Sequence, residues 1–148
     1  MSLQQDPIVV DAENLVMGRL ASVVAKWLLS GKRVVIVNAE KSIVVGEPHR
    51  IIERFKRKLQ LRTHYNPEKT GPKIPHRPDG ILKRAIRGML PRKTPRGRRA
   101  FKRLRVYIGV PPEYKNVPKI KPQEAYLKNQ RAEFLHLAEI ARHLGWRG

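Results

Sequence analysis

The chain has 148 residues, of which 41% are hydrophobic, and its 32 Lys and Arg residues outnumber 12 Asp and Glu residues, for a formal net charge of +20. This length predicts one domain with its own hydrophobic core, and the hydrophobic content argues against general disorder. The lack of cysteine excludes disulfides, thiolate metal sites and a cysteine nucleophile. Because no stretch resembles a signal peptide or is long enough to cross a bilayer, we expect a cytoplasmic protein without a membrane partner.

The positive charge is concentrated in the middle of the chain. Residues 49–105 hold 20 Lys and Arg residues against three Asp and Glu residues, whereas residues 1–30 hold two against three. Between Arg84 and Arg105 there are ten basic residues and no acidic one. Self-repulsion on this scale destabilises a compact state unless an anionic partner screens it. Polyanions bind such surfaces with release of counterions, so the pattern predicts a nucleic-acid interface.

The first part of the chain predicts a strand, a helix and a second strand. Residues 8–10 form a short apolar run, and apolar residues then recur at helical spacing over residues 20–28. Residues 33–37 are rich in β-branched side chains, which is typical of a strand buried on both faces. Residues 42–45 extend or return from that strand after a turn at residues 38–41. Such a βαβ unit predicts a parallel sheet with a right-handed crossover.

The basic middle of the chain predicts three helices separated by proline-rich segments. One helix begins at Glu47 and Pro48, and residues 63–78, with four prolines and a glycine, predict an extended arm. Asp79 is expected to cap a second helix that Pro91 ends, and a short basic helix follows it. Each helix combines an apolar stripe for the core with a basic stripe that stays outside.

The remaining sequence predicts one more buried strand at Val106–Val110 and a helical tail from Pro122 onward. We therefore expect a single domain over residues 1–148. Its predicted parts are a core, a basic RNA-binding region and a helical C-terminal extension, at about residues 7–114, 49–105 and 115–148.

Arginine outnumbers lysine between Arg84 and Arg105. Its planar guanidinium can bridge two phosphate oxygens and stack on an exposed base. The extended arms add reach into grooves between RNA helices. Because the chain shows no helix-turn-helix, zinc-finger or basic-zipper pattern, structured RNA is favoured over duplex DNA.

The sequence offers little support for catalysis. His49, His64 and His76 lack the neighbouring carboxylates and the i, i+4 spacing that metal sites use. Asp11 and Glu13 follow the first predicted strand, where α/β enzymes place catalytic acids, but turn formation and helix capping also explain them. The loop after that strand has a single glycine, where nucleotide-binding loops need several. We therefore expect no catalytic residue, metal, cofactor or small-molecule substrate. An enzyme that acts on RNA is kept as an alternative hypothesis.

Four blocks of the sequence resemble a known family. They read VDAENLVMGRLAS at residues 10–22, VVIVNAEKSIVVG at 34–46, HRPDGILKRAIRGMLP at 76–91 and RGRRAFKRLRVYIGVPPEY at 96–114. In this order they closely resemble the L-thirteen (L13) family of large-subunit ribosomal proteins. The ending LAEIARHLGW at residues 137–146 resembles its archaeal and eukaryotic branch.

The resemblance implies a three-layer α/β/α domain with a mostly parallel four-stranded sheet and no catalytic activity. It also implies a structural constituent of the large ribosomal subunit in the cytoplasm. Such a protein binds large-subunit ribosomal RNA, contacts neighbouring ribosomal proteins, and supports subunit assembly and translation. A free RNA-binding translational regulator is the alternative.

Basic residues on the matching positions are the expected phosphate contacts. The central group comprises Arg84, Arg87, Arg92, Lys93, Arg96, Arg98, Arg99, Lys102 and Arg103, and the next group comprises Arg54, Arg57 and Lys58. For any single residue outside the central group, a solvated or internally paired side chain is an equally good interpretation.

Overall fold

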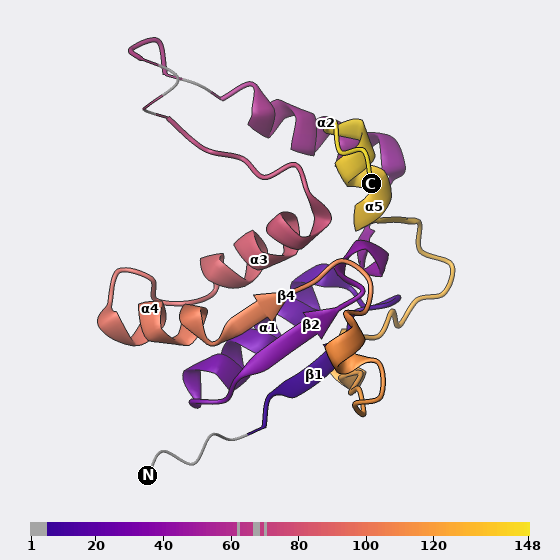
Figure 1. The fold of residues 1–148 in the computed structure, drawn as a ribbon. Helices are drawn as coiled ribbons and strands as arrows, with labels where there is room; N and C mark the ends of the chain where they lie inside the picture. The colour runs from indigo at the N-terminus through magenta and orange to yellow at the C-terminus, as the bar shows by residue number, and fades with distance from the viewer. Residues whose placement is uncertain (1–5, 62, 67–68, 70) are drawn as a thin grey trace.

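The computed structural model describes residues 6–61, 63–66, 69 and 71–148 (Figure 1). Within these residues, the main sheet has three parallel strands in the order β1-β2-β4. The strands are β1 (Ile8–Asp11), β2 (Val34–Val37) and β4 (Leu104–Val106). Ile8 pairs with Val34, and Val34 pairs with Leu104, so all three strands begin at the same end of the sheet.

Helix α1 (Met17–Leu29) connects β1 to β2. It buries one stripe, which includes Leu20, Val24 and Leu28. All four residues of β2 are buried because β2 is the central strand and both faces of the sheet are covered. The predicted strand, helix and parallel strand are therefore confirmed.

The predicted four-stranded sheet is not confirmed. After β2, Asn38 adopts a left-handed conformation with φ of 56°, and a 3-10 turn η1 (Ala39–Lys41) leads the chain out of the sheet. Strand β3 (Ile43–Val45) then pairs antiparallel with β5 (Phe134–His136) in a separate small sheet. On the open side of β1, one isolated parallel bridge joins Val10 to Ile120.

Helices cover one face of the main sheet. Helix α1 packs against α3 (Pro78–Gly88) and α4 (Pro95–Lys102), and this core includes Val10, Ile36 and Leu104 of the strands. The opposite face, formed by Val9, Val35 and Val37, is covered by Tyr107, Val110 and Tyr114. Those residues come from a segment with a short 3-10 helix η2 (Pro112–Tyr114), so a full helical layer is found on one side of the sheet among the described residues.

Strand β4 ends at Val106, so the prediction of a strand over Val106–Val110 is wrong for most of its length. Beyond Val106 the chain crosses over the second face of the sheet, where the partly buried Tyr107 and Val110 pack against valines of β1 and β2. Gly109, with φ of 68°, provides a backbone conformation that this change of direction needs.

Helix α2 (Pro48–Leu59) packs against α5 (Leu137–His143), away from the main sheet (Figure 1). The chain then runs outward and returns to α3, and the described residues between 60 and 77 hold no helix or strand, as predicted for the arm. The tail is helical only at α5 and a 3-10 turn η3 (Gln123–Ala125). The helical prediction fails at β5 because this segment pairs with β3 and buries Leu135.

Asp79 does not cap α3 as predicted. The N-cap residue is Arg77, and Asp79 lies in the first turn, where its Oδ1 accepts the Gly80 N–H at 2.9 Å. The same oxygen lies 3.5 Å from Nε of Arg77. A negatively charged carboxylate in the first turn stabilises the helix, because it lies near the positive end of the helix dipole.

Candidate nucleic-acid interface

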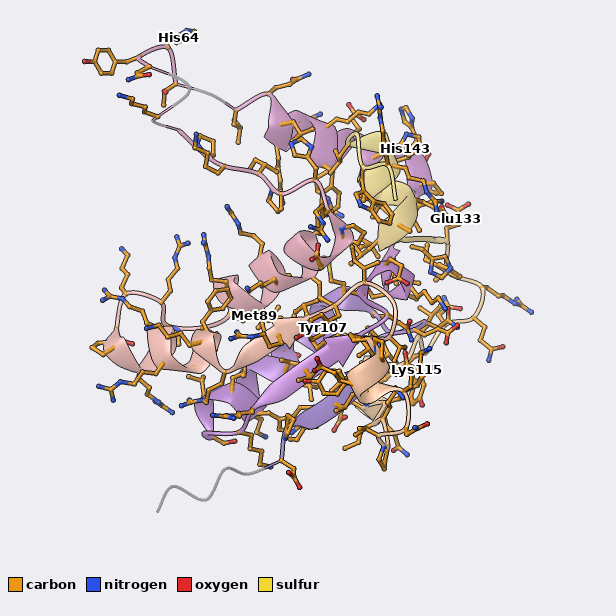
Figure 2. The ribbon with its side chains drawn as sticks, in the orientation of Figure 1. His64, Met89, Tyr107, Lys115, Glu133 and His143 are labelled. Atoms are coloured by element: carbon orange, nitrogen blue, oxygen red, sulfur yellow. The ribbon has the colours of Figure 1, made fainter. Side chains whose placement is uncertain are left out.

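The basic surface is built by α3, α4 and the turn between them. Helix α3 docks through Ile81, Leu82 and Ile86, and α4 docks through Gly97 and Ala100. The other faces of these helices stay outside the core. Figure 2 shows long, nitrogen-tipped side chains projecting from α4 and the preceding turn. The exposed members of the predicted central group are Arg92, Lys93, Arg96, Arg98, Arg99 and Lys102.

The turn before α4 is held by a set of short-range hydrogen bonds. Thr94 is the N-cap of α4: its Oγ1 accepts the Gly97 N–H at 3.3 Å and donates to the carbonyl of Pro91 at 2.7 Å. Arg98 Nε donates to the carbonyl of Arg92 at 3.2 Å, and one terminal nitrogen donates to that of Lys93 at 3.3 Å. The surface cations are therefore carried on an ordered turn.

Arg87 is partly buried between other cations. Its buried Nε has no hydrogen-bond partner among the described residues. Burial lowers the pKa of Arg87, and the positive charges of Arg84 and Arg92 lower it further. Because an arginine side chain keeps its proton in proteins, this crowding leaves a concentrated positive charge that a bound anion would stabilise.

Two predicted contacts, Arg84 and Arg103, also hold the fold together. A terminal nitrogen of Arg84 donates to the carbonyl of Lys73 and so ties α3 to the arm. A terminal nitrogen of Arg103 donates to the carbonyl of Leu28 at 2.7 Å, joining the start of β4 to the end of α1. A guanidinium has five N–H donors, so one internal bond leaves others for a ligand.

The second predicted group lies on a different element. Arg54, Arg57 and Lys58 are exposed on α2. Arg57 forms an ion pair with Glu53 at 3.2 Å, and Nζ of Lys58 lies 5.4 Å from the centre of the Phe55 ring. These residues are not part of the α4 surface.

Lys58 does share a groove with Arg84. The groove measures about 280 Å³ and lies between α2, the arm and α3. Phe55 and Ile81 are among the apolar side chains that line it. The structure therefore brings one member of each predicted group together.

Sequence reasoning missed three basic residues with defined surroundings. Nζ of Lys83 lies 5.2 Å from the centre of the Phe101 ring, which joins α3 to α4 by a cation–π contact. Arg33 and Arg105 line a hollow at the beginning of the strands. Arg103 is the C-cap of α4 and Arg105 lies in β4, so no single periodicity in the sequence places the two side chains together.

The acids at the carboxyl end of the sheet are engaged in loop structure. Asp11 Oδ1 accepts the Glu13 N–H and an Asn38 side-chain N–H, both at 3.0 Å. Glu40 Oε2 accepts the Gly109 N–H at 3.0 Å. Asp11 therefore forms the turn that the sequence suggested.

The three histidines considered for catalysis lie apart. His49 is on α2, Figure 2 shows His64 at the far end of the arm, and His76 Nδ1 lies 2.8 Å from the Leu144 carbonyl. Among the described residues, no group of three or more His, Asp and Glu side chains could hold a metal ion. No helix in the described part of the chain is long and apolar enough to span a membrane.

The model of the family "Ribosomal protein L13" matches residues 5–113, which include every predicted RNA-contact position. The chain belongs to the ribosomal protein L13 family. This confirms the resemblance found in the sequence.

Similar L13 proteins come from several archaea, in agreement with the predicted branch. The large ribosomal subunit protein uL13 of Pyrobaculum islandicum is 48% identical over 148 residues, which cover 95% of this chain and 80% of the relative. The uL13 proteins of Aeropyrum pernix and Methanocaldococcus jannaschii are 46% and 44% identical. The alignment with the Aeropyrum pernix protein covers 95% of this chain and 91% of that relative. The alignment with the Methanocaldococcus jannaschii protein covers 93% of this chain and 96% of that relative. The likeness thus extends beyond residue 113 into the C-terminal segment.

Proposed function

We propose that this L13-family protein is a structural constituent of the large ribosomal subunit in the cytoplasm. In this role it binds large-subunit ribosomal RNA, contacts neighbouring ribosomal proteins, and supports subunit assembly and translation. Residues 1–148 act as one domain, with a core at about 7–114, RNA-binding side chains within 49–105 and an extension at 115–148. Family membership supports the ribosomal role, and the uncompensated basic surface of α3 and α4 carries the RNA-binding part.

The charge balance of that surface is the main physical argument. In the described residues, the ion pairs join Arg50 to Glu47, Arg57 to Glu53 and Arg77 to Asp79. All of them lie outside the segment from Arg84 to Arg105, which contains no Asp or Glu. Binding of RNA phosphates there would release condensed counterions and relieve the repulsion between the cations.

The geometry of α4 also favours a polyphosphate ligand. The cap at Thr94 and the bonds of Arg98 order the turn, so Arg96 and Arg99 project from a fixed helix. Ordering these long side chains costs less entropy on binding when their backbone is already fixed. A surface of this kind suits the backbone of a folded RNA rather than the chemistry of a small substrate.

Co-sedimentation with ribosomal subunits tests this function. The wild-type protein should migrate with large subunits in moderate salt, and Arg96→Gln/Arg99→Gln should shift a large fraction to the top of the gradient. Lys128→Gln/Arg142→Gln removes the same charge from other exposed positions and should migrate as wild type. A wild-type protein found mainly in the free pool would contradict the structural role and favour the regulator.

A further inference from the structure

A hollow of about 430 Å³ lies at the end of the main sheet where its strands begin. Four basic side chains line it: Arg33, Lys102, Arg103 and Arg105. This end is opposite to the one at which Asp11 and Asn38 lie. The hollow is therefore separate from the loops that α/β proteins commonly use for ligands.

The strand register explains why these residues meet. The Ile8 N–H donates to the carbonyl of Arg33 at 2.9 Å, and the Val34 N–H donates to the carbonyl of Arg103 at 3.2 Å. Arg33 and Arg103 thus precede neighbouring strands at the same level. Arg105 pairs with Val35 in the register of β4 and β2.

No described acidic side chain in the lining of this hollow balances its positive charge. No Asp or Glu is among its described lining residues, and none of its cations takes part in an ion pair found in the described residues. Like charges on neighbouring strands repel. The buried Nε of Arg103 also lacks a hydrogen-bond partner among the described residues. An anion in the hollow would relieve the repulsion between these cations.

The basic side chains are partly positioned in advance. One terminal nitrogen of Arg105 donates to the carbonyls of Leu104 at 3.1 Å and Lys102 at 3.4 Å. Arg103 is held by its bond to Leu28. Arg33 is exposed at the rim, where it can close on a ligand.

The apolar part of the lining indicates more than a bare phosphate. Pro7, Val35 and Tyr114 complete the hollow. The ring of Tyr114 packs on the second face of the sheet, and its centre lies 6.0 Å from the centre of the Tyr107 ring. Figure 2 labels Tyr107 beside the strands of the main sheet. Cations beside an aromatic side chain are the combination that binds unpaired nucleotides.

The Tyr114 hydroxyl adds a hydrogen-bond donor. Burial raises the pKa of Tyr114, and Tyr107 and Glu113 raise it further against the opposing effect of Arg105. The hydroxyl therefore keeps its proton at neutral pH and can donate to a phosphate oxygen.

We propose that this hollow holds one unpaired nucleotide of an RNA strand, with its phosphate between Arg33 and Arg105 and its base against Tyr114. The inference depends on the proposed RNA-binding function and adds a second contact to that of α4. Lys102 and Arg103 lie between the two contacts along the chain, so one RNA could engage both.

Fluorescence anisotropy with two RNA probes tests the proposal. The probes are labelled decauridylate, which is single-stranded, and a labelled ten-base-pair RNA duplex, each titrated at several salt concentrations. Arg33→Gln/Arg105→Gln should weaken decauridylate binding about ten-fold and duplex binding much less. Its salt slope for decauridylate should fall by about 0.7, the value for one phosphate on a single strand. Lys128→Gln/Arg142→Gln is the charge-matched control and should bind as wild type.

Variants of Tyr114 test the base contact. Tyr114→Leu should weaken decauridylate binding about five-fold or more without changing the salt slope, because stacking does not neutralise phosphate. Tyr114→Phe keeps the ring but loses the hydroxyl donor, so its affinity for decauridylate should lie between those of the wild type and Tyr114→Leu. Thermal unfolding of each variant shows whether the fold is retained. If Tyr114→Leu unfolds, crosslinking of 4-thiouridine-substituted decauridylate to the wild-type peptide around Tyr114 provides the readout, and its absence would overturn the base contact.

The outcomes separate this inference from the proposed function. If Arg96→Gln/Arg99→Gln loses RNA binding but Arg33→Gln/Arg105→Gln binds decauridylate as wild type, the nucleotide site is wrong and the α4 interface stands. Equal weakening of both probes by Arg33→Gln/Arg105→Gln would also overturn the nucleotide site. If the wild-type protein binds neither probe at low salt, both proposals fail. Tighter binding of a poly-glutamate peptide than of decauridylate would assign the hollow to an acidic protein instead.

Discussion

A Cβ atom at Gly97 would lie 2.1 Å from the carbonyl oxygen of Pro91, so glycine is the residue that lets α4 pack onto the turn before it. The backbone atom cannot move aside as a flexible side chain would. This close approach places the basic face of α4 directly beside Arg92 and Lys93. The geometry of the proposed interface thus depends on a residue that has no charge.

We expect Gly97→Ala to destabilise the protein by about 1–3 kcal/mol, the usual cost of forcing extra volume into a packed contact. RNA affinity should fall as well because α4 must move. Gly88→Ala is the matched control, since a Cβ there meets nothing within 4 Å and alanine favours a helix. Urea unfolding and anisotropy measure the two effects, and a Gly97→Ala protein as stable as Gly88→Ala would contradict the packing argument.

Thr94→Ala should cost about 1 kcal/mol of unfolding free energy, because it removes the side-chain cap of α4. The lost interaction is the bond from the Gly97 N–H to Oγ1 of Thr94. Thr94→Ser keeps an oxygen at the same place and should recover most of the stability. Chemical denaturation of the three proteins checks this, and equal losses for Ala and Ser would show that the methyl group matters instead.

Arg103 and Arg96 should respond to substitution in different ways. Arg103→Gln removes a partly buried bond to the carbonyl of Leu28, which should lower stability by about 1.5–3 kcal/mol. Arg96 is exposed, so Arg96→Gln should change stability by less than about 0.5 kcal/mol while weakening RNA binding. Thermal unfolding and RNA titration of each single variant separate the two roles. An equally large stability loss for Arg96→Gln would remove the distinction.

The affinity for structured large-subunit RNA should fall steeply with salt. The logarithm of the binding constant should decrease linearly with the logarithm of salt concentration, with a slope of about −0.7 to −0.9 for each phosphate neutralised. Arg96→Gln/Arg99→Gln should make that slope less steep by up to the contribution of about two phosphates. Titrations between low and moderate salt provide the measurement. A slope that stays at the wild-type value would exclude these two arginines from the interface.

Local pattern was enough to predict several elements. Helix α1 and strand β2 were predicted because their apolar residues recur at the periods of a helix and a buried strand. The amphipathic helices α2, α3 and α4 were predicted for the same reason, and the start of α2 also from the proline in its first turn. These signals are local, since neighbouring residues in one turn or one strand determine them.

The errors arose where contacts between distant segments decide the structure. Strand β3 pairs with β5, about ninety residues later in the chain, instead of extending the main sheet. The segment after Val106 leaves the sheet because Tyr107 covers valines of β1 and β2. A run of apolar residues indicates burial but does not say which surface it will cover.

The candidate interface shows the same division. By itself the sequence determined that this chain carries a concentrated cationic segment, that the segment forms amphipathic helices and that it belongs with the L13 family, because charge, periodicity and motifs are properties of the chain. Only the tertiary structure decided that Arg103 bonds to α1 and that Arg33 meets Arg105 at the beginning of the sheet. Those roles depend on distances between residues far apart in the chain, and packing of the core sets those distances.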